Sequence, residues 1–287
     1  MNPKITIVTA TLNRAPVLKR CLDSVRNQRY QDYEHIVIDG GSTDGTVELL
    51  QKHQKDDHNL KWISEPDNGI SEAFNKGLER MTGDCVAILG DDDLYLPNAF
   101  AIIAAAVNDH PDAGLWSGGA EFVNNSGEHL GFTTARFSNR RRLIQNWLGD
   151  VSLAAPSTFI SRHAIEKAGN FREADRFAMD YRHWIEITRY FDVVVLPEIL
   201  SQVRYDEGTV SFSQRRLQIS ETLKISREYW NDYGTITRLR IAASYVAWLP
   251  KDMKGRIFHW GVKKAPNCIK RLRRRILNLP GPQDSTT

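Results

Sequence analysis

Three consecutive aspartates, Asp91, Asp92 and Asp93, come one glycine after the hydrophobic run 85–89. Two such charges about 5 Å apart repel each other by roughly 3 kcal/mol at an effective dielectric near 20. A divalent cation with oxygen ligands, Mg²⁺ or Mn²⁺, offsets this repulsion and usually completes its shell with substrate phosphates. The alternatives are a solvated acidic turn, or Asp93 capping a helix that Pro97 helps to start. The position after a buried strand favours a metal site.

Polar residues also follow three other predicted strands. These groups are Thr9 to Arg14, Asp39 to Asp44, and Glu65 to Gly69. Ligands of open parallel sheets bind beside the carboxyl ends of the strands, so we expect the groups to face one ligand. The first group lacks glycine and no P-loop motif occurs, which excludes dinucleotide-binding and P-loop sites. Asp39 could accept a hydrogen bond from a base or sugar, or could simply form a turn.

Alternating strand and helix patterns must position these groups. Buried-strand patterns occupy residues 4–10, 35–38, 60–63 and 85–89, and apolar residues at helical spacing separate them. Strands separated in this way become parallel neighbours joined by crossover helices. The predicted fold class is therefore α/β, with a doubly wound, mostly parallel sheet flanked by helices.

The pattern after residue 94 is less regular. It predicts strands at 113–116, 121–124 and 192–196 and a helix at 177–190. From about residue 213 the chain reads as helical and increasingly basic.

Composition places the chain among soluble globular proteins. It has 287 residues, of which 41% are hydrophobic and 25% charged. No apolar stretch approaches the roughly 20 residues of a membrane span, and the first residues do not read as a signal peptide. The three cysteines are far apart, as in neither a disulfide framework nor a zinc site. We therefore expect a cytoplasmic protein.

Several strings of this sequence resemble the family 2 inverting glycosyltransferases of the bacterial surface-polysaccharide type, which have the GT-A fold. The matching strings, in order, are Ile5 to Arg14, Val37 to Thr46, Ser64 to Gly77, Ile88 to Asp93, Ala168 to Phe171 and Ala178 to Tyr181. Their order and spacing, over about residues 4–211, carry the resemblance. It implies a metal-dependent enzyme that moves a sugar from a nucleotide-sugar donor, a UDP-sugar, to a glycan or lipid-linked acceptor.

The resemblance also implies roles for individual residues. Thr9 and Asp39 would line the base pocket, and Asp67 would lie near the nucleotide. Asp92 would face the ribose or sugar, and Asp93 would bind Mn²⁺ or Mg²⁺. Asp91 belongs to the same motif, as a donor-binding residue and a second metal ligand. The strings supply further donor-binding candidates, which are Thr11, Asn13, Arg14, Asn75 and Lys76.

The resemblance makes Asp180 the general base, at the start of an acceptor-side helix. A positioned carboxylate can take the proton of an attacking hydroxyl, and a helix start favours its charge. The alternative is a simple N-cap aspartate. One departure concerns the family pattern Arg-x-His, because this chain has Arg204-Tyr-Asp206. Asp206 is therefore a candidate for an additional metal ligand.

The resemblance predicts a GT-A domain at residues 1–212, and the change of composition near residue 213 predicts a helical basic extension at 213–287. The domain divides into a nucleotide-binding half at 1–93 and an acceptor half at 94–212.

The extension is strongly basic. Residues 251–279 carry a net charge of +9, whereas the whole chain carries +3. Within 263–279 an apolar stripe lies between the cations, which suits either an anionic membrane surface or docking on the domain. Membrane binding would place the protein on the inner face of the cell membrane. Nucleic acid is not an expected partner, because no aromatic residues alternate with these cations.

Two other function classes remain open from the sequence. A sugar-phosphate nucleotidyltransferase shares the layer architecture but should have a glycine-rich first loop, which residues 9–14 lack. A non-catalytic membrane-surface scaffold would depend mainly on the basic tail. It predicts that Asp93→Ala leaves function intact.

Overall fold

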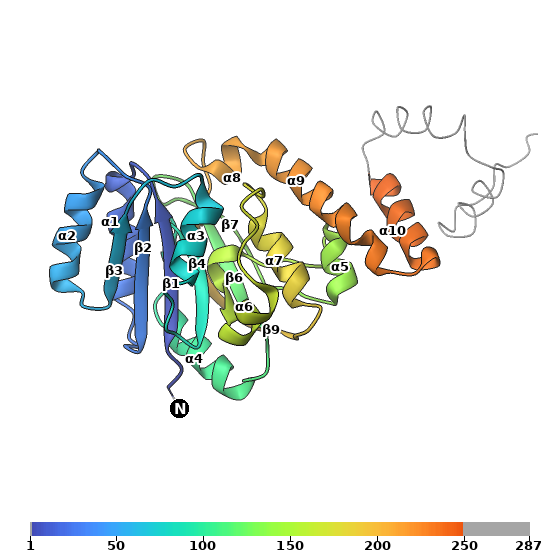
Figure 1. Ribbon diagram of the computed structural model, residues 1–287, viewed down its shortest axis with the longest axis horizontal. Helices are drawn as coiled ribbons and strands as arrows, with labels where there is room; N and C mark the ends of the chain where they lie inside the picture. The colour runs from blue at the N-terminus through green and yellow to red at the C-terminus, as the bar shows by residue number, and fades with distance from the viewer. Residues whose placement is uncertain (1, 249–287) are drawn as a thin grey trace, which may run out of the picture.

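The computed structural model describes residues 2–248, so the basic segment 251–279 lies outside the described residues. Its N-terminal half alternates strands and helices (Figure 1). In chain order these are β1 (Ile5–Thr11), α1 (Ala15–Arg26), β2 (Tyr33–Asp39), α2 (Thr46–Asp56), β3 (Leu60–Ser64), α3 (Ile70–Leu78) and β4 (Cys85–Gly90). The four strands are parallel in the order β3-β2-β1-β4. This arrangement confirms the predicted α/β layer.

The second half extends the same sheet with strands of mixed direction. These strands are β5 (Leu94–Tyr95), β6 (Leu115–Val123), β7 (His129–Thr133), β8 (Thr158–Ser161) and β9 (Val193–Arg204). Within the described residues the order is β3-β2-β1-β4-β8-β6-β9-β5, and β7 pairs with β6. β8 is antiparallel to β4 and β6, whereas β9 is parallel to β6.

The predicted strands 113–116 and 121–124 form one strand, β6. Gly118 and Gly119 lie between the two predicted strands, and their lack of a side chain allows close packing. A Cβ at Gly118 would come within 2.5 Å of the Leu200 side chain on β9. β9 in turn continues through Pro197 to Arg204, beyond the predicted end at residue 196.

Helices cover both faces of the sheet (Figure 1). The remaining helices are α4 (Ala99–Asp109), α5 (Arg140–Ile144), η1 (Asn146–Leu148), η2 (Ala155–Ser157), α6 (Arg162–Ala168), α7 (Met179–Ile187), α8 (Val210–Ser213), α9 (Arg215–Glu228), η3 (Tyr229–Asp232) and α10 (Thr235–Trp248). α7 lies within the predicted helix 177–190. Within residues 2–248 no helix has the length and apolarity needed to cross a bilayer.

Among the described residues, the two largest hydrophobic clusters lie on opposite faces of the sheet. One contains Leu22 of α1 and Phe100 of α4, and the other contains Phe74 of α3, Trp184 of α7 and Ile225 of α9. This division is what a doubly wound sheet requires, because both of its faces must be covered. α9 therefore packs into the core that also contains α7.

The strand order reverses at β1, which has β2 on one side and β4 on the other. The register pairs Ala10 with Gly90, so Thr11 and Asp91 lie next to each other at the carboxyl ends of these strands. Ligands of open α/β sheets bind at such a switch point. The predicted acidic run therefore lies at the position in the sheet that favours a ligand site.

Candidate active site

The acidic run is neutralised in part by Arg14, the residue that precedes α1. Thr11 Oγ1 donates to Asp91 Oδ2 over 2.9 Å, and Arg14 Nε donates to Asp91 Oδ1 over 3.3 Å. The same guanidinium pairs with Asp92. Four of the predicted donor-binding residues thus come together at the switch point. A guanidinium within the chain offsets part of the carboxylate repulsion.

Asp93 has a different environment. Its side chain is buried, with the residue 8% exposed, and its Oδ1 accepts the Arg204 backbone N–H over 3.0 Å. Burial, with Asp92 nearby, raises the pKa of Asp93 to about 8. Burial also raises the pKa of Asp91 to about 6, although Arg14 opposes this shift. Among residues 2–248, no lysine or arginine side chain forms an ion pair with Asp93. Asp93 is therefore the carboxyl group of the run whose charge is least compensated.

The carboxylates of residues 91–93 provide only some of the oxygen ligands that a hard cation requires. Over the described part of the chain, no three His, Cys, Asp or Glu side chains are grouped so that they could hold a metal ion. Mg²⁺, however, is commonly bound by one or two carboxylates together with substrate phosphates and water. The buried, unpaired carboxyl of Asp93, next to Asp91, fits that mode.

Asp206 pairs with an arginine of its own loop. Both of its carboxylate oxygens bind the Arg204 guanidinium, over 2.7 and 2.9 Å. The guanidinium also holds the pKa of Asp206 below its usual value. A role for Asp206 as an additional metal ligand stays a prediction.

Asp39, at the end of β2, is fully buried. Its Oδ2 accepts the backbone N–H groups of Gly41 and Ser42 and the Ser64 hydroxyl, the last over 2.6 Å. Its Oδ1 accepts the Ser42 hydroxyl. Asp39 thus stabilises the turn after β2, which was the alternative role expected from the sequence. Its contact with a nucleotide base stays a prediction.

The loops after β1, β2 and β3 are held against each other. The Asn13 backbone N–H donates to Ser42 Oγ over 2.7 Å, and Asn13 Oδ1 accepts the Thr43 N–H over 2.8 Å. Asp67 lies over Gly40, where a Cβ would approach its Oδ2 to 2.8 Å. These loops therefore bring Asn13, Asp39 and Asp67 together, as predicted for groups that follow neighbouring strands.

Two predicted donor-binding residues form hydrogen bonds inside the protein. Thr9 is fully buried and its hydroxyl hydrogen-bonds His35 Nε2 over 3.0 Å, so this side chain faces the core. Asn75 is also buried, and its amide exchanges two hydrogen bonds with the Phe171 backbone over 2.8 and 2.9 Å. Contacts of Thr9 and Asn75 with the donor stay predictions.

Lys76 pairs with Glu65 and Glu72 over 3.0 and 3.1 Å. Its contact with the donor stays a prediction.

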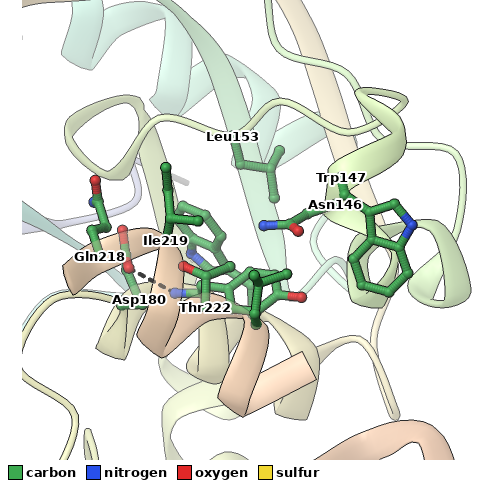
Figure 2. Close-up of a pocket in the computed structure, with 11 residues that line it drawn as sticks. Asn146, Trp147, Leu153, Asp180, Gln218, Ile219 and Thr222 are labelled. Carbon is green, nitrogen blue, oxygen red and sulfur yellow. Dashed lines mark hydrogen bonds between the residues drawn. The ribbon is translucent and has the colours of Figure 1, made fainter. Parts of the chain in front are cut away.

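A cavity of about 380 Å³ lies beside the first turn of α7 (Figure 2). Its lining comes from η1, α7, α9 and nearby segments: Asn146, Trp147, Leu153, Ala178, Asp180, Tyr181, Trp184, Gln218, Ile219, Thr222 and Leu223. Asp180 is partly buried there and accepts the Tyr181 backbone N–H over 2.7 Å. Burial raises the pKa of Asp180 to about 6. A carboxylate with this pKa can accept a proton near neutral pH.

The remaining lining is suited to a polyhydroxylated ligand. Two indole side chains provide apolar faces, and Asn146, Gln218 and Thr222 provide amide and hydroxyl groups that can bind ligand hydroxyls. Sequence reasoning missed these three residues. Asn146 lies in η1, and Gln218 and Thr222 lie in α9. Neither element contains a string that matches the family, and isolated polar residues outside such strings look like ordinary surface positions.

Comparison with known proteins gives a family match over more than half of the chain. Residues 6–168 match the family described as Glycosyl transferase family 2. The matched segment contains the carboxyl ends of β1 to β8, but not β9.

Curated relatives match a shorter part of the chain. A PGL/p-HBAD biosynthesis glycosyltransferase of Mycobacterium tuberculosis is 36% identical over 115 residues, which are 39% of this chain and 45% of that protein. The GalNAc(5)-diNAcBac-PP-undecaprenol beta-1,3-glucosyltransferase of Campylobacter jejuni is 33% identical over 109 residues, 37% of this chain and 35% of that protein. The match therefore spans less than half the length of these relatives.

Solved structures match almost the whole chain at low identity. S. aureus TarS 1-349 in complex with UDP-GlcNAc has a TM-score of 0.67 and 18% identity, over 96% of this chain and 79% of that one. The mannosyltransferase PcManGT of Pyrobaculum calidifontis, in complex with GDP-Man and Mn2+, has a TM-score of 0.61 and 17% identity, over 97% and 86%. At these identities the likeness concerns the fold, which is the GT-A fold expected from the sequence.

Proposed function

The chain belongs to glycosyl transferase family 2, and from this premise we propose that it is a metal-dependent, inverting glycosyltransferase. It transfers a sugar from a UDP-sugar to a glycan or lipid-linked acceptor in polysaccharide biosynthesis. The observation that carries the proposal is the buried carboxyl of Asp93, which has no ion-pair partner among residues 2–248 and lies in an acidic run at the β1–β4 switch point. The family match favours this reaction over nucleotidyl transfer.

The donor diphosphate would lie against the acidic run. Asp93, with Asp91, would hold Mn²⁺ or Mg²⁺, which neutralises the charge of the departing nucleoside diphosphate when bound. The adjoining loops, with Asn13, Asp39 and Asp67, would surround the nucleoside. Support comes from the shared fold of TarS, whose structure contains UDP-GlcNAc, and of PcManGT, whose structure contains Mn2+.

Arg14 has a place in donor binding as well. In the structure it pairs with Asp91 and Asp92. Because a cation at the run would take over part of this neutralising role, the guanidinium could turn to a phosphate oxygen, for which its planar fork is suited. We therefore retain Arg14 as a donor-binding residue.

The acceptor would occupy the cavity beside α7, with one hydroxyl against Asp180. Asp180 would remove the proton of that hydroxyl as it attacks the anomeric carbon. A base that lies on the opposite side of the sugar from the leaving group produces inversion, the geometry also used by inverting glycosidases. The pKa of about 6 leaves Asp180 mostly ionised at neutral pH and still basic enough to accept a proton.

A lipid-linked acceptor would bring the reaction to a membrane surface. The printed name of the Campylobacter relative includes a PP-undecaprenol acceptor. In this chain the cations of residues 263–279 would contribute roughly 1 kcal/mol each at an anionic surface. We propose peripheral attachment through this segment, which lies outside the described residues.

A panel of nucleotide sugars, with Mn²⁺ or with EDTA, tests the proposal. A donor present at 100 times its Kd stabilises the protein by about 2.7 kcal/mol, so the preferred donor should raise the unfolding temperature measurably. Because the metal is part of the proposed donor site, this rise should occur with Mn²⁺ and not with EDTA. That donor is then incubated with acceptor glycans and the release of UDP is measured. The proposal is wrong if no nucleotide sugar stabilises the protein in the presence of either metal.

A further inference from the structure

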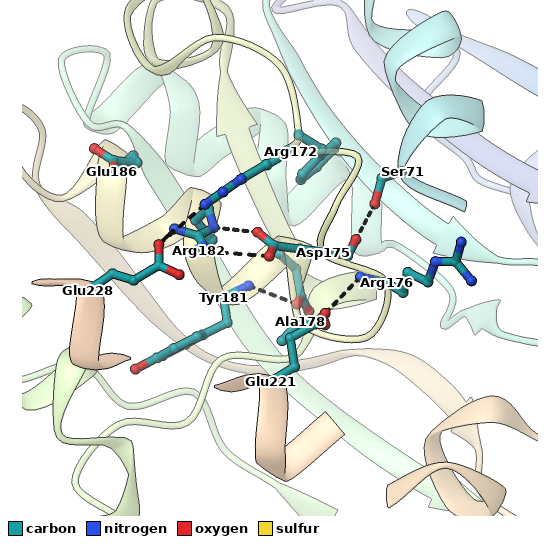
Figure 3. A network of polar contacts seen from close by, with 12 residues as sticks. Ser71, Arg172, Asp175, Arg176, Ala178, Tyr181, Arg182, Glu186, Glu221 and Glu228 are labelled. Atoms are coloured by element: carbon teal, nitrogen blue, oxygen red, sulfur yellow. Dashed lines mark hydrogen bonds and ion pairs between the residues drawn. The ribbon is translucent and has the colours of Figure 1, made fainter. Parts of the chain in front are cut away.

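α9 contacts the segment that leads into α7 through one carboxylate (Figure 3). Glu221 Oε1 accepts the backbone N–H of Arg176 over 3.0 Å, and its Oε2 accepts those of Phe177 and Ala178 over 2.6 and 2.8 Å. Three consecutive backbone donors thus converge on a single side chain from another helix. Asp180 follows two residues after the last of them.

These donors need a partner from outside the segment. The first N–H groups of a helix have no partner within the helix and are usually satisfied by a side chain at the N-cap. The N-cap residue of α7 is Ala178, whose side chain accepts no hydrogen bond. Of the three donors that Glu221 accepts, the Ala178 N–H is one of these first helix groups, whereas those of Arg176 and Phe177 belong to the segment before the helix. The negative charge of Glu221 is also favourable beside a helix N-terminus.

Further contacts hold the same segment from other sides. Ser71 Oγ donates to the Asp175 carbonyl over 2.6 Å, and the Asp175 carboxylate forms a buried ion pair with Arg182 on α7. Arg182 Nη1 also reaches Glu228 on α9, over 2.7 Å. Glu228 of α9 therefore contacts α7 through Arg182, whereas Glu221 contacts the residues just before the start of the helix (Figure 3).

The same stretch of α9 lines the cavity. Gln218 and Thr222 both contribute to its wall, three residues before and one residue after Glu221 (Figure 2). Building on the function proposed above, we propose that Glu221 is the positioning residue for Asp180. Through Glu221, the helix that contacts the acceptor also fixes the base that deprotonates it.

Glu221 also acts on Asp180 electrostatically. Burial is the main cause of the raised pKa of Asp180, the Tyr181 N–H opposes the shift, and the charge of Glu221 adds to it. The other titratable side chains of α7 are engaged elsewhere. Arg182 binds Asp175 and Glu228, and His183 Nε2 hydrogen-bonds the Gly169 carbonyl over 2.9 Å. The Tyr181 hydroxyl donates to the Leu143 carbonyl over 3.1 Å, and Glu186 accepts the Tyr229 hydroxyl. Removal of the Glu221 charge should therefore lower the pKa of Asp180.

Two substitutions separate the geometric effect from the electrostatic one. Glu221→Gln removes the charge and replaces one acceptor oxygen by a donor, so at least one of the three hydrogen bonds is lost. We expect kcat to fall about tenfold or more, because small displacements of a reacting group cost up to about 100-fold. The acid limb of the pH–rate profile should move to lower pH, while KM for the donor stays within about twofold.

Glu221→Asp keeps the charge but shortens the side chain by one methylene. It should lower kcat as well and leave the acid limb in place. Glu173→Gln is the control, because it removes the same charge from an exposed position on the same segment. Glu173→Gln should change neither kcat nor the pH at which the acid limb of the pH–rate profile falls. An unchanged acid limb in Glu221→Gln would overturn the proposed coupling to the base.

Hydrogen exchange tests the anchoring without any turnover. In Glu221→Gln the amides of residues 176–178 should exchange at least about tenfold faster than in the wild type, and in Glu173→Gln they should not. Equal exchange in the wild type and Glu221→Gln would overturn the positioning role. If the amides of Glu221→Gln exchange faster but the wild type turns over no nucleotide sugar, the anchoring role of Glu221 stands and the proposed function is refuted instead.

Discussion

Replacement of Asp180 by asparagine should remove catalysis and leave donor binding intact. The side chain keeps its size and can still accept the Tyr181 N–H, so the start of α7 should be preserved. An amide cannot take a proton from the acceptor hydroxyl, and a general base contributes roughly 10²- to 10⁴-fold to a rate. We expect kcat to fall by that factor and the Kd of the UDP-sugar to change less than about twofold.

The pH dependence of the wild type follows from the same group. Burial raises the pKa of Asp180 to about 6, and the ionised form is the active one. Activity should therefore be full above this value and fall as the pH drops through it, to about a tenth of the plateau at one unit below. The limb should be absent from the residual activity of Asp180→Asn.

Initial rates of UDP release between pH 4.5 and 8.5, at saturating donor and metal, measure both effects. Asp112→Asn serves as the control, because Asp112 is exposed and loses the same charge. Near-wild-type kcat in Asp180→Asn, or an acid limb that persists in it, would refute the assignment of the base.

Further predictions concern the donor site, the fold and the tail. Asp93→Asn should weaken metal-dependent UDP binding at least about tenfold by calorimetry, and equal affinity with Mn²⁺ would remove Asp93 as a metal ligand. Arg182→Met should lower the free energy of unfolding by roughly 3–5 kcal/mol, because it leaves Asp175 buried without a partner. The exposed Arg172→Met, which removes another contact of Glu228, should cost less than about 1 kcal/mol in the same melts. A chain ending at Pro250 should no longer sediment with anionic vesicles, and equal sedimentation of both chains would favour docking of the tail on the domain.

The sequence predicted the elements whose hydrophobic pattern is continuous. The four parallel strands and the acidic run after β4 were expected, because buried strands and strand-end polar residues leave a clear local signal. β6 was divided wrongly, because the fit of Gly118 against Leu200 depends on a strand about 80 residues away. Local patterns cannot express such a contact.

The partners of several site candidates depend on contacts of the same kind. Thr9 lies in a predicted strand, and its hydroxyl is bound to His35 of the neighbouring strand. Asn75 is held by Phe171, 96 residues further along the chain. The pairing of Asp206 is local by contrast, since Arg204 lies only two residues before it. Glu221 carries no sequence signal for its role, because its partners are backbone groups of another segment.

The proposed function requires that the acidic run at the β1–β4 edge holds a cation together with the donor diphosphate. A crystal structure of the protein with a UDP-sugar and Mn²⁺ would show this site. We expect the ion at the Asp93 carboxylate and the diphosphate, with the nucleoside among the loops of Asn13, Asp39 and Asp67. A nucleotide bound away from this edge, or bound there without a metal at Asp93, would show that the proposed donor site is wrong.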